Sequence, residues 1–296
     1  MNKWAYVSVL LAAVLWGTTG TAQNFIEGEA HALTIGAIRL AIGGFSLFAI
    51  ALLMKKFVWR TVPWEAVVLS AISMALFQPL FFSSVQLTGI AVGTVVAIGS
   101  APVLAGMIEW LVLRKTPGRV WAAATAMAII GCLLLFANSE AGAVHAGGIA
   151  MALGAGLAFA VYAIVSKRVL EEMESVPAVA LIFSMSALCL QPFLFLFDLS
   201  YIGESRNLAL LVYLGIGATS LSYLLFSGGL RAIPSSSAVT LSLAEPLTAA
   251  LLGVFVVGER LGWISWVGVS LLLGGILVLT LGKGSKKGAR DAPLTE

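Results

Sequence analysis

Apolar residues occupy ten long stretches of this chain, and short polar segments separate each stretch from the next. Each stretch has about 20 residues, enough for a helix rising about 1.5 Å per residue to cross the roughly 30 Å hydrocarbon core of a bilayer. None shows the alternation of apolar and polar positions that is typical of a barrel strand. Because only helices and closed barrels satisfy the backbone in lipid, the pattern predicts an all-α polytopic membrane protein. The predicted transmembrane helices are residues 4–23, 33–54, 65–86, 90–113, 120–137, 147–166, 177–197, 208–229, 235–257 and 263–282.

The first stretch also has features of a secretory signal peptide, namely Lys3, an apolar run and small residues near Thr21. Its apolar run is long, and Trp16 and Gly17 interrupt the smooth apolar segment that a signal peptide contains. We therefore interpret it as the first transmembrane helix.

Lys and Arg residues are distributed unequally between the two ends of the predicted helices. With the N-terminus in the cytoplasm, 14 of the 17 basic residues fall on the cytoplasmic side, two fall outside, and Arg39 lies within a helix. The positive-inside rule therefore predicts cytoplasmic termini and favours an even number of helices. Residues 283–296 are predicted to form a disordered basic cytoplasmic tail. The cytoplasmic residues are Lys3, Lys55, Lys56, Arg60, Arg114, Lys115, Arg119, Lys167, Arg168, Arg231, Lys283, Lys286, Lys287 and Arg290, and the outside residues are Arg206 and Arg260.

The composition agrees with a membrane location and points to few other partners. Hydrophobic residues make up 60% of the chain and charged residues 10%, and the mean hydropathy is +1.02. The net charge of +3 is explained by the cytoplasmic loops and requires no nucleic acid. Cys132 and Cys189 both lie in mid-helix, where we interpret them as packing residues rather than a disulfide or a metal pair. We expect no cofactor, metal or nucleotide, and a monomer surrounded by the lipid bilayer.

The two halves of the chain match without a gap over three predicted helices when the sequence is shifted by 144 residues. Single matches are common in so apolar a chain, but two mid-helix prolines, Pro102 and Pro246, also coincide. Five helices per half is an odd number, so the halves must insert with opposite orientations. The sequence thus predicts two inverted five-helix repeats, residues 1–140 and 145–282, an architecture that many secondary transporters share. Further matching pairs are Leu80 and Leu224, Phe82 and Phe226, Ser83 and Ser227, and Gly131 and Gly275.

Several motifs make the chain resemble the EamA-type transporters of the drug/metabolite transporter superfamily, over essentially its whole length. The motifs are Leu15-Trp16-Gly17 in the first helix, Arg39 in the second, Pro102 in the fourth, and Glu245-Pro246 with Gly258-Glu259 around the ninth. The first half departs from the pattern, since Leu113-Arg114-Lys115 stands where the second half has Val257-Gly258-Glu259.

The resemblance implies a bacterial inner-membrane exporter of amino acids or related metabolites, with its substrate site between the two repeats. The inverted repeat and the paired mid-depth prolines favour alternating access, which we expect to be facilitated, and a proton-coupled antiporter of other metabolites or drugs is the alternative. An intramembrane enzyme is the competing class, but His31 and His145 lie in predicted loops and the chain has no His-Glu-x-x-His motif. The chain has no repeated filter loop of the kind that would indicate a channel. It also has no Walker motif of the kind that would indicate an ATP-driven pump.

Glu245 is the clearest candidate for a substrate-binding residue. A carboxylate at mid-depth costs about 2.5–3.5 kcal/mol on insertion scales, so such residues usually face the bundle interior. Pro246 frees a backbone carbonyl one turn earlier. Glu245 is therefore either a proton acceptor or contact for a substrate ammonium, or a protonated side chain bonded to that carbonyl.

Uncharged candidates lie at similar depth in other helices. Gln78 precedes Pro79 and supplies polar groups that suit a zwitterion, although an interhelical hydrogen bond would explain it equally well. Aromatic residues at this depth are either packing residues or part of the cavity wall, because a buried Tyr hydroxyl needs a partner. The remaining predicted substrate-binding residues are Trp16, Phe82, Ser100, Tyr162 and Tyr223.

Two charged residues and four tryptophans are expected to serve structure rather than transport. Arg39 is expected to pair with a carboxylate on the outside, and Glu109 to lie near the cytoplasmic interface. Tryptophans at helix ends are typical interface anchors. These are Trp59, Trp64, Trp121 and Trp263.

Overall fold

The computed structural model describes residues 3–28, 30–137, 145–258 and 260–281, and over these ranges every regular element is helical. The predicted tail and Glu259 lie outside the described residues. The first half contains α1 (Lys3–Asn24), α2 (Ala32–Leu53), η1 (Trp59–Thr61), α3 (Trp64–Thr88), α4 (Ile90–Leu111) and α5 (Arg119–Leu135). The second half contains α6 (Ala146–Glu172), α7 (Ser175–Leu190), η2 (Gln191–Phe195), η3 (Ser200–Gly203), α8 (Ser205–Gly215), η4 (Ile216–Leu221), α9 (Ser222–Leu230), α10 (Ser235–Leu241), α11 (Ala244–Leu252), η5 (Gly253–Val257) and α12 (Trp263–Leu281).

The predicted membrane spans are confirmed. Within the described ranges, 9 helical stretches are long and apolar enough to cross a membrane, and α5 is a shorter apolar helix of 17 residues. Two spans contain several elements each, because α8, η4 and α9 form one stretch and α10, α11 and η5 another.

Local hydrogen bonding explains why these two spans are irregular. In η4, a π-helix, the hydroxyls of Thr219 and Ser220 donate to carbonyls five residues earlier, at 2.8 and 3.2 Å. Between α10 and α11, the Glu245 N–H donates to the Ser242 carbonyl three residues earlier, at 2.9 Å. Pro246 follows and has no N–H, so the helix is interrupted beside Glu245.

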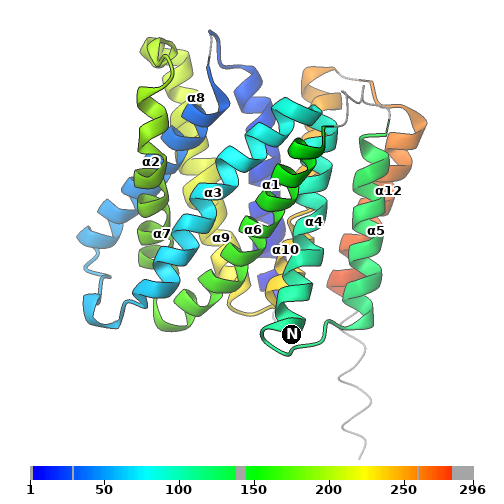
Figure 1. Ribbon diagram of the computed structural model, residues 1–296, viewed down its shortest axis with the longest axis horizontal. Helices are drawn as coiled ribbons and strands as arrows, with labels where there is room; N and C mark the ends of the chain where they lie inside the picture. The colour runs from blue at the N-terminus through cyan, green and yellow to red at the C-terminus, as the bar shows by residue number, and fades with distance from the viewer. Residues whose placement is uncertain (1–2, 29, 138–144, 259, 282–296) are drawn as a thin grey trace, which may run out of the picture.

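The two halves interlock as inverted repeats. α2 packs against α7 and α5 against α12, so corresponding helices of the halves meet in pairs. The third span of each half packs along the first span of the other, α3 along α6 and α9 along α1. Because five spans separate the start of α1 from that of α6, the two helices enter from opposite ends of the bundle (Figure 1). The all-α fold with two inverted repeats agrees with the prediction, whereas the exact boundaries 1–140 and 145–282 stay predictions.

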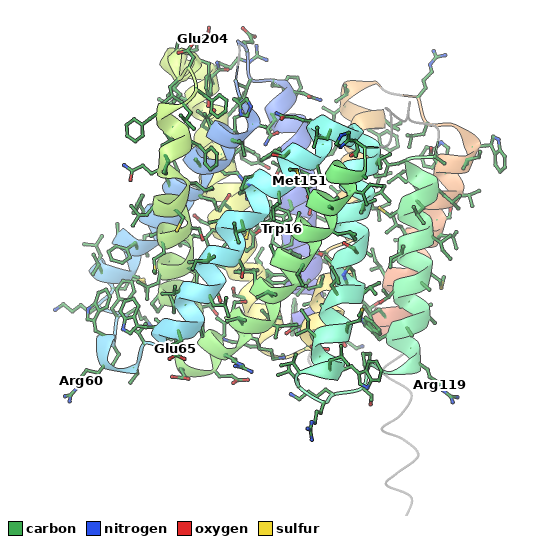
Figure 2. All side chains as sticks on the ribbon, in the orientation of Figure 1. Trp16, Arg60, Glu65, Arg119, Met151 and Glu204 are labelled. Atoms are coloured by element: carbon green, nitrogen blue, oxygen red, sulfur yellow. The ribbon has the colours of Figure 1, made fainter. Side chains whose placement is uncertain are left out.

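The two ends of the bundle differ in charge. We call the end at which α1 begins the basic end, and the other the opposite end. Figure 2 shows Arg60 and Arg119 at the basic end and Glu204 at the opposite end. At the opposite end Arg206 forms an exposed ion pair with Glu27. The other described basic residues of the basic end are Lys3, Lys55, Lys56, Arg114, Lys115, Lys167, Arg168 and Arg231.

Glycines allow α5 and α12 to approach closely, which leads to a test of the packing. A Cβ atom on Gly268 would lie 2.5 Å from the Leu135 nitrogen and 2.6 Å from the Gly131 carbonyl oxygen. Because these neighbours are backbone atoms, Gly268→Ala forces the helices apart, and overpacking costs about 1–3 kcal/mol. We expect a lower thermal unfolding midpoint in detergent.

The matched control for this packing test is Gly228→Ala in α9, where a Cβ atom would meet nothing within 4 Å. Alanine is favoured over glycine in a helix by about 1 kcal/mol, so this variant should be as stable as wild type or more so. Equal midpoints for the two variants would contradict the close approach of α5 and α12.

Candidate functional site

A cavity of about 560 Å³ opens from the middle of the bundle toward the opposite end, and we call it the central cavity. Trp16, which Figure 2 shows at mid-height, lines its deep part. Asn24, Ala32 and Val257, from helix ends at the opposite end of the bundle, line its outer part. Cavities of this size are typical of small-molecule sites.

Five of the seven residues predicted as substrate contacts line this cavity. They come from α1, α3, α9 and α11, which the two interlocked repeats bring together at mid-depth. Gln78 lies just before Pro79 in α3, and Glu245 lies in the first turn of α11. The five residues are Trp16, Gln78, Phe82, Tyr223 and Glu245.

Ser100 and Tyr162 do not line the central cavity. The Ser100 hydroxyl donates to the Ala97 carbonyl at 3.2 Å and faces Gly156 of α6. The side of α4 that faces the cavity instead carries Ala97, Ile98 and Ala101. Tyr162 is fully buried among other aromatic rings. Both placements correct the prediction: Ser100 lies on the side of α4 that faces α6, and Tyr162 packs behind Phe159, which lines the cavity.

Six aromatic residues close the central cavity toward the basic end, and we call them the aromatic layer: Trp16, Phe159, Tyr162, Phe183, Tyr223 and Phe226. The Trp16 ring centroid lies 4.7 Å from that of Tyr223, 5.3 Å from that of Phe226 and 6.0 Å from that of Phe159. Three of the six, Trp16, Phe159 and Tyr223, line the cavity, and the others pack behind them.

Arg39 lines the central cavity, a position that the sequence prediction missed. It lies two turns into α2, about 10 Å from the helix start at 1.5 Å per residue. One of its terminal nitrogens donates to the Gln78 side-chain oxygen at 3.4 Å, and its Nε has no hydrogen-bond partner. The expected pairing with an outside carboxylate is not found among the described residues, in which Arg39 takes part in no ion pair. Its depth within the span was the signal for a cavity position.

Glu245 faces the same cavity, and within the described part of the chain its carboxylate makes no hydrogen bond and no ion pair. The interpretation in which it bonds to the backbone carbonyl freed by Pro246 is therefore not the arrangement in this structure. Arg39 and Glu245 are close enough to interact electrostatically, although no N–O distance of 4.0 Å or less joins them.

A cluster of polar side chains joins α4 and α5 to α10 on the basic side of the aromatic layer. Glu109, only 7% exposed, accepts hydrogen bonds from the Ser236 N–H at 3.2 Å and hydroxyl at 2.5 Å. The Trp121 indole nitrogen donates to the Thr240 hydroxyl at 3.1 Å, and Thr125 bonds to the same hydroxyl at 2.9 Å. We call these five residues the basic-end cluster. Trp121 is half-buried and hydrogen-bonded to α10, whereas Trp59, Trp64 and Trp263 are exposed. The role of these four residues as interface anchors stays a prediction.

A second cavity, of about 600 Å³, lies at the basic end, beside the basic-end cluster. Its wall contains the cluster residues Glu109, Trp121 and Ser236 and the cations Lys115 and Lys167. The Lys167 ammonium donates to the Ile233 carbonyl at 2.5 Å. The basic-end cluster and the aromatic layer therefore lie between two separate cavities. Among the described residues, no group of three or more His, Cys, Asp or Glu side chains is placed to hold a metal ion.

Comparison with known proteins places this architecture in a family. The model of the EamA-like transporter family matches residues 3–137 and 146–281. The chain is 45% identical over 287 residues to the uncharacterized transporter YwfM of Bacillus subtilis, covering 97% of both chains. It is 26% identical over 298 residues to the uncharacterized inner membrane transporter YicL of Salmonella typhimurium, again covering 97% of both. A crystal structure shares the fold with a TM-score of 0.82 at 21% identity, covering 94% of this chain and 98% of that one.

Proposed function

This chain belongs to the EamA-like transporter family and is a multi-pass membrane transporter, and on that premise we propose that it exports amino acids or related small metabolites by facilitated alternating access. The observation that carries the proposal is the one-sided central cavity, which has polar side chains at mid-depth and a closed basic end. Alternating access requires such a site near the midplane, reached from one side at a time.

The interlocked repeats provide a route to the second state. In an inverted-repeat transporter, one half adopts the conformation of the other, so an opening at one end is replaced by an opening at the other. In this chain the exchange would break the basic-end cluster, separate the aromatic layer and close the mouth beside Asn24 and Val257. The central cavity would then join the basic-end cavity.

The proposed orientation places the basic end in the cytoplasm. It is supported by the concentration of Lys and Arg at that end, with Arg206 and Arg260 alone placed outside among the described residues. With both termini cytoplasmic in a bacterial inner membrane, the described conformation is open to the outside. Export would then release substrate through the mouth that this conformation presents.

The substrate class is supported by the chemistry of the cavity wall. Phe77, Phe81, Phe82 and Ile98 provide an apolar surface, and Gln78 provides an uncharged polar group beside it. A small metabolite with an apolar side chain and a polar head fits such a wall.

Proton-coupled antiport is the alternative mechanism, because Glu245 is an acidic residue in the cavity wall that has no bonded partner in the described part of the chain. A proton gradient separates the two mechanisms. We expect purified protein in liposomes to exchange internal for external radiolabelled amino acid from a panel, with no accumulation above equilibrium when only a pH gradient is supplied. Accumulation driven by the pH gradient alone would establish coupling, and no exchange of any panel member would contradict the proposed function.

Two tryptophan substitutions provide matched controls for this transport assay. Gly20 lines the cavity and has open space around it, so Gly20→Trp fills the route that substrate takes and should abolish exchange. Gly228 is exposed on the outer surface of α9, so Gly228→Trp should leave exchange unchanged.

A further inference from the structure

Among the described residues, one cationic and one acidic side chain line the central cavity, and they do not neutralise each other directly. Arg39 and Glu245 both line it, and no N–O distance within 4.0 Å joins them. A charge held at mid-depth in a membrane is costly unless it is paired, and arginine stays protonated in proteins. Two unpaired charges in one cavity therefore indicate groups that a ligand completes.

The surroundings of Arg39 are rich in hydrogen-bond donors. Gln78 is 1% exposed, and its side-chain oxygen accepts from Arg39, so its amide nitrogen remains without a partner. The Arg39 Nε and the Trp16 indole nitrogen are also without hydrogen-bond partners among the residues that the structure describes. A guanidinium has five N–H donors and no acceptor, and a carboxylate has only acceptors. The donors beside Arg39 therefore match a ligand carboxylate.

The surroundings of Glu245 have the opposite character. An ionised carboxylate accepts hydrogen bonds and donates none, which matches the three donors of a ligand ammonium. Among the described residues, no protein group donates a hydrogen bond to the Glu245 carboxylate or forms an ion pair with it. The break before Pro246 keeps this side chain at the start of α11, facing the cavity.

We propose that Arg39 with Gln78 binds the carboxylate, and Glu245 the ammonium, of a zwitterionic α-amino acid with an apolar side chain. This inference rests on the proposed function and assigns its specificity. A simple anion would be attracted by Arg39 but repelled by Glu245. A simple cation would be attracted by Glu245 but repelled by Arg39, so the cavity discriminates against both kinds of ligand. The ligand side chain lies against Phe77, Phe81 and Phe82.

The test uses three ligands that differ only in their charged groups. They are L-leucine, its decarboxylated form 3-methylbutylamine, and its deaminated form 4-methylpentanoate. Binding to purified protein is measured by calorimetry, which does not depend on transport. We expect wild type to bind leucine at least tenfold more tightly than either derivative, because each derivative leaves one buried charge unpaired.

Two variants assign the charges individually. Arg39→Gln should weaken leucine and 4-methylpentanoate at least tenfold and should strengthen 3-methylbutylamine, because it removes the charge that repels the ammonium. Glu245→Gln should weaken leucine and 3-methylbutylamine at least tenfold and should strengthen 4-methylpentanoate, because it removes the charge that repels the carboxylate. Arg206→Gln and Glu204→Gln repeat the same substitutions on exposed residues of the opposite end and should change nothing.

Three outcomes would overturn the inference: tightest binding of the amine or the acid by wild type, no binding of leucine, or equal weakening of all three ligands by both variants. Amino-acid exchange in liposomes with unchanged charge preference in both variants would overturn this inference but leave the proposed function standing. Absence of exchange of every amino acid tested would contradict the proposed function itself.

Discussion

Replacing Glu109 with alanine is expected to open the basic end of the bundle. The substitution leaves the buried Ser236 N–H and hydroxyl without their acceptor. An unsatisfied buried donor costs about 1–3 kcal/mol, and about 1.4 kcal/mol changes a population ratio tenfold. Because the cost falls on the conformation in which the basic-end cluster is formed, the equilibrium should shift at least tenfold toward the conformation open at that end.

A buried cysteine measures this opening. Ala238 in α10 is 0% exposed, so Ala238→Cys is protected while the basic end is closed. It is introduced after Cys132 and Cys189 have been replaced by alanine. With Glu109→Ala added, a membrane-impermeant maleimide supplied at the basic end should react at least tenfold faster.

Glu171→Ala is the control for this experiment, since Glu171 also lines the basic-end cavity but is exposed. It removes the same charge and should leave the labelling rate unchanged. An unchanged rate in Glu109→Ala would show that the cluster does not hold the basic end closed. A thermal unfolding midpoint near that of wild type distinguishes opening from unfolding.

Replacing Trp16 with alanine should produce the largest loss of stability among single substitutions in the cavity wall. The indole is 6% exposed and contacts Tyr223, Phe226 and Phe159. Loss of a buried aromatic side chain costs about 3–5 kcal/mol. At roughly 2 °C per kcal/mol for a chain of this size, the thermal unfolding midpoint in detergent should fall by about 6 °C or more.

Trp16→Phe should recover most of this loss, because a phenyl ring keeps the contact with Tyr223. Trp110→Ala removes the same side chain at the end of α4, where Trp110 is 54% exposed, and should change the midpoint little. Equal destabilisation by Trp16→Ala and Trp110→Ala would contradict the packing of the aromatic layer.

The membrane spans and the inverted repeat were predictable because they depend on the length of each apolar run and on repeated positions. The two aligned prolines indicated the inverted repeat, and the cost of a buried carboxylate indicated Glu245. These signals depend on depth along the helix axis, which the position of a residue within its span gives directly.

The side of the helix on which a residue lies was not predictable. A helix that is apolar all round gives no stripe from which to infer its rotation. Ser100 and Ala101 are therefore indistinguishable by depth, yet Ala101 faces the cavity and Ser100 faces α6. The basic-end cluster was missed for a related reason, since Glu109 and Ser236 are 127 residues apart and only tertiary packing brings them together.

Helix length varies around the bundle, and this has a consequence for the surrounding lipid. α3 and α6 have 25 and 27 residues, whereas α5 and α12, which pack together, have 17 and 19. At 1.5 Å per residue the long pair measures about 38–40 Å and the short pair about 26–29 Å. Figure 1 shows α3 and α6 running obliquely and α5 and α12 more upright.

Tilt fits the long helices to a roughly 30 Å hydrocarbon layer, but a short upright helix fits only where the acyl chains compress around it. We therefore expect the membrane to be thinned beside α5 and α12. A change in the tilt of α3 and α6 would change the hydrophobic thickness that these helices present to the lipid, so we expect acyl-chain length to contribute to the free-energy difference between conformations of the transporter.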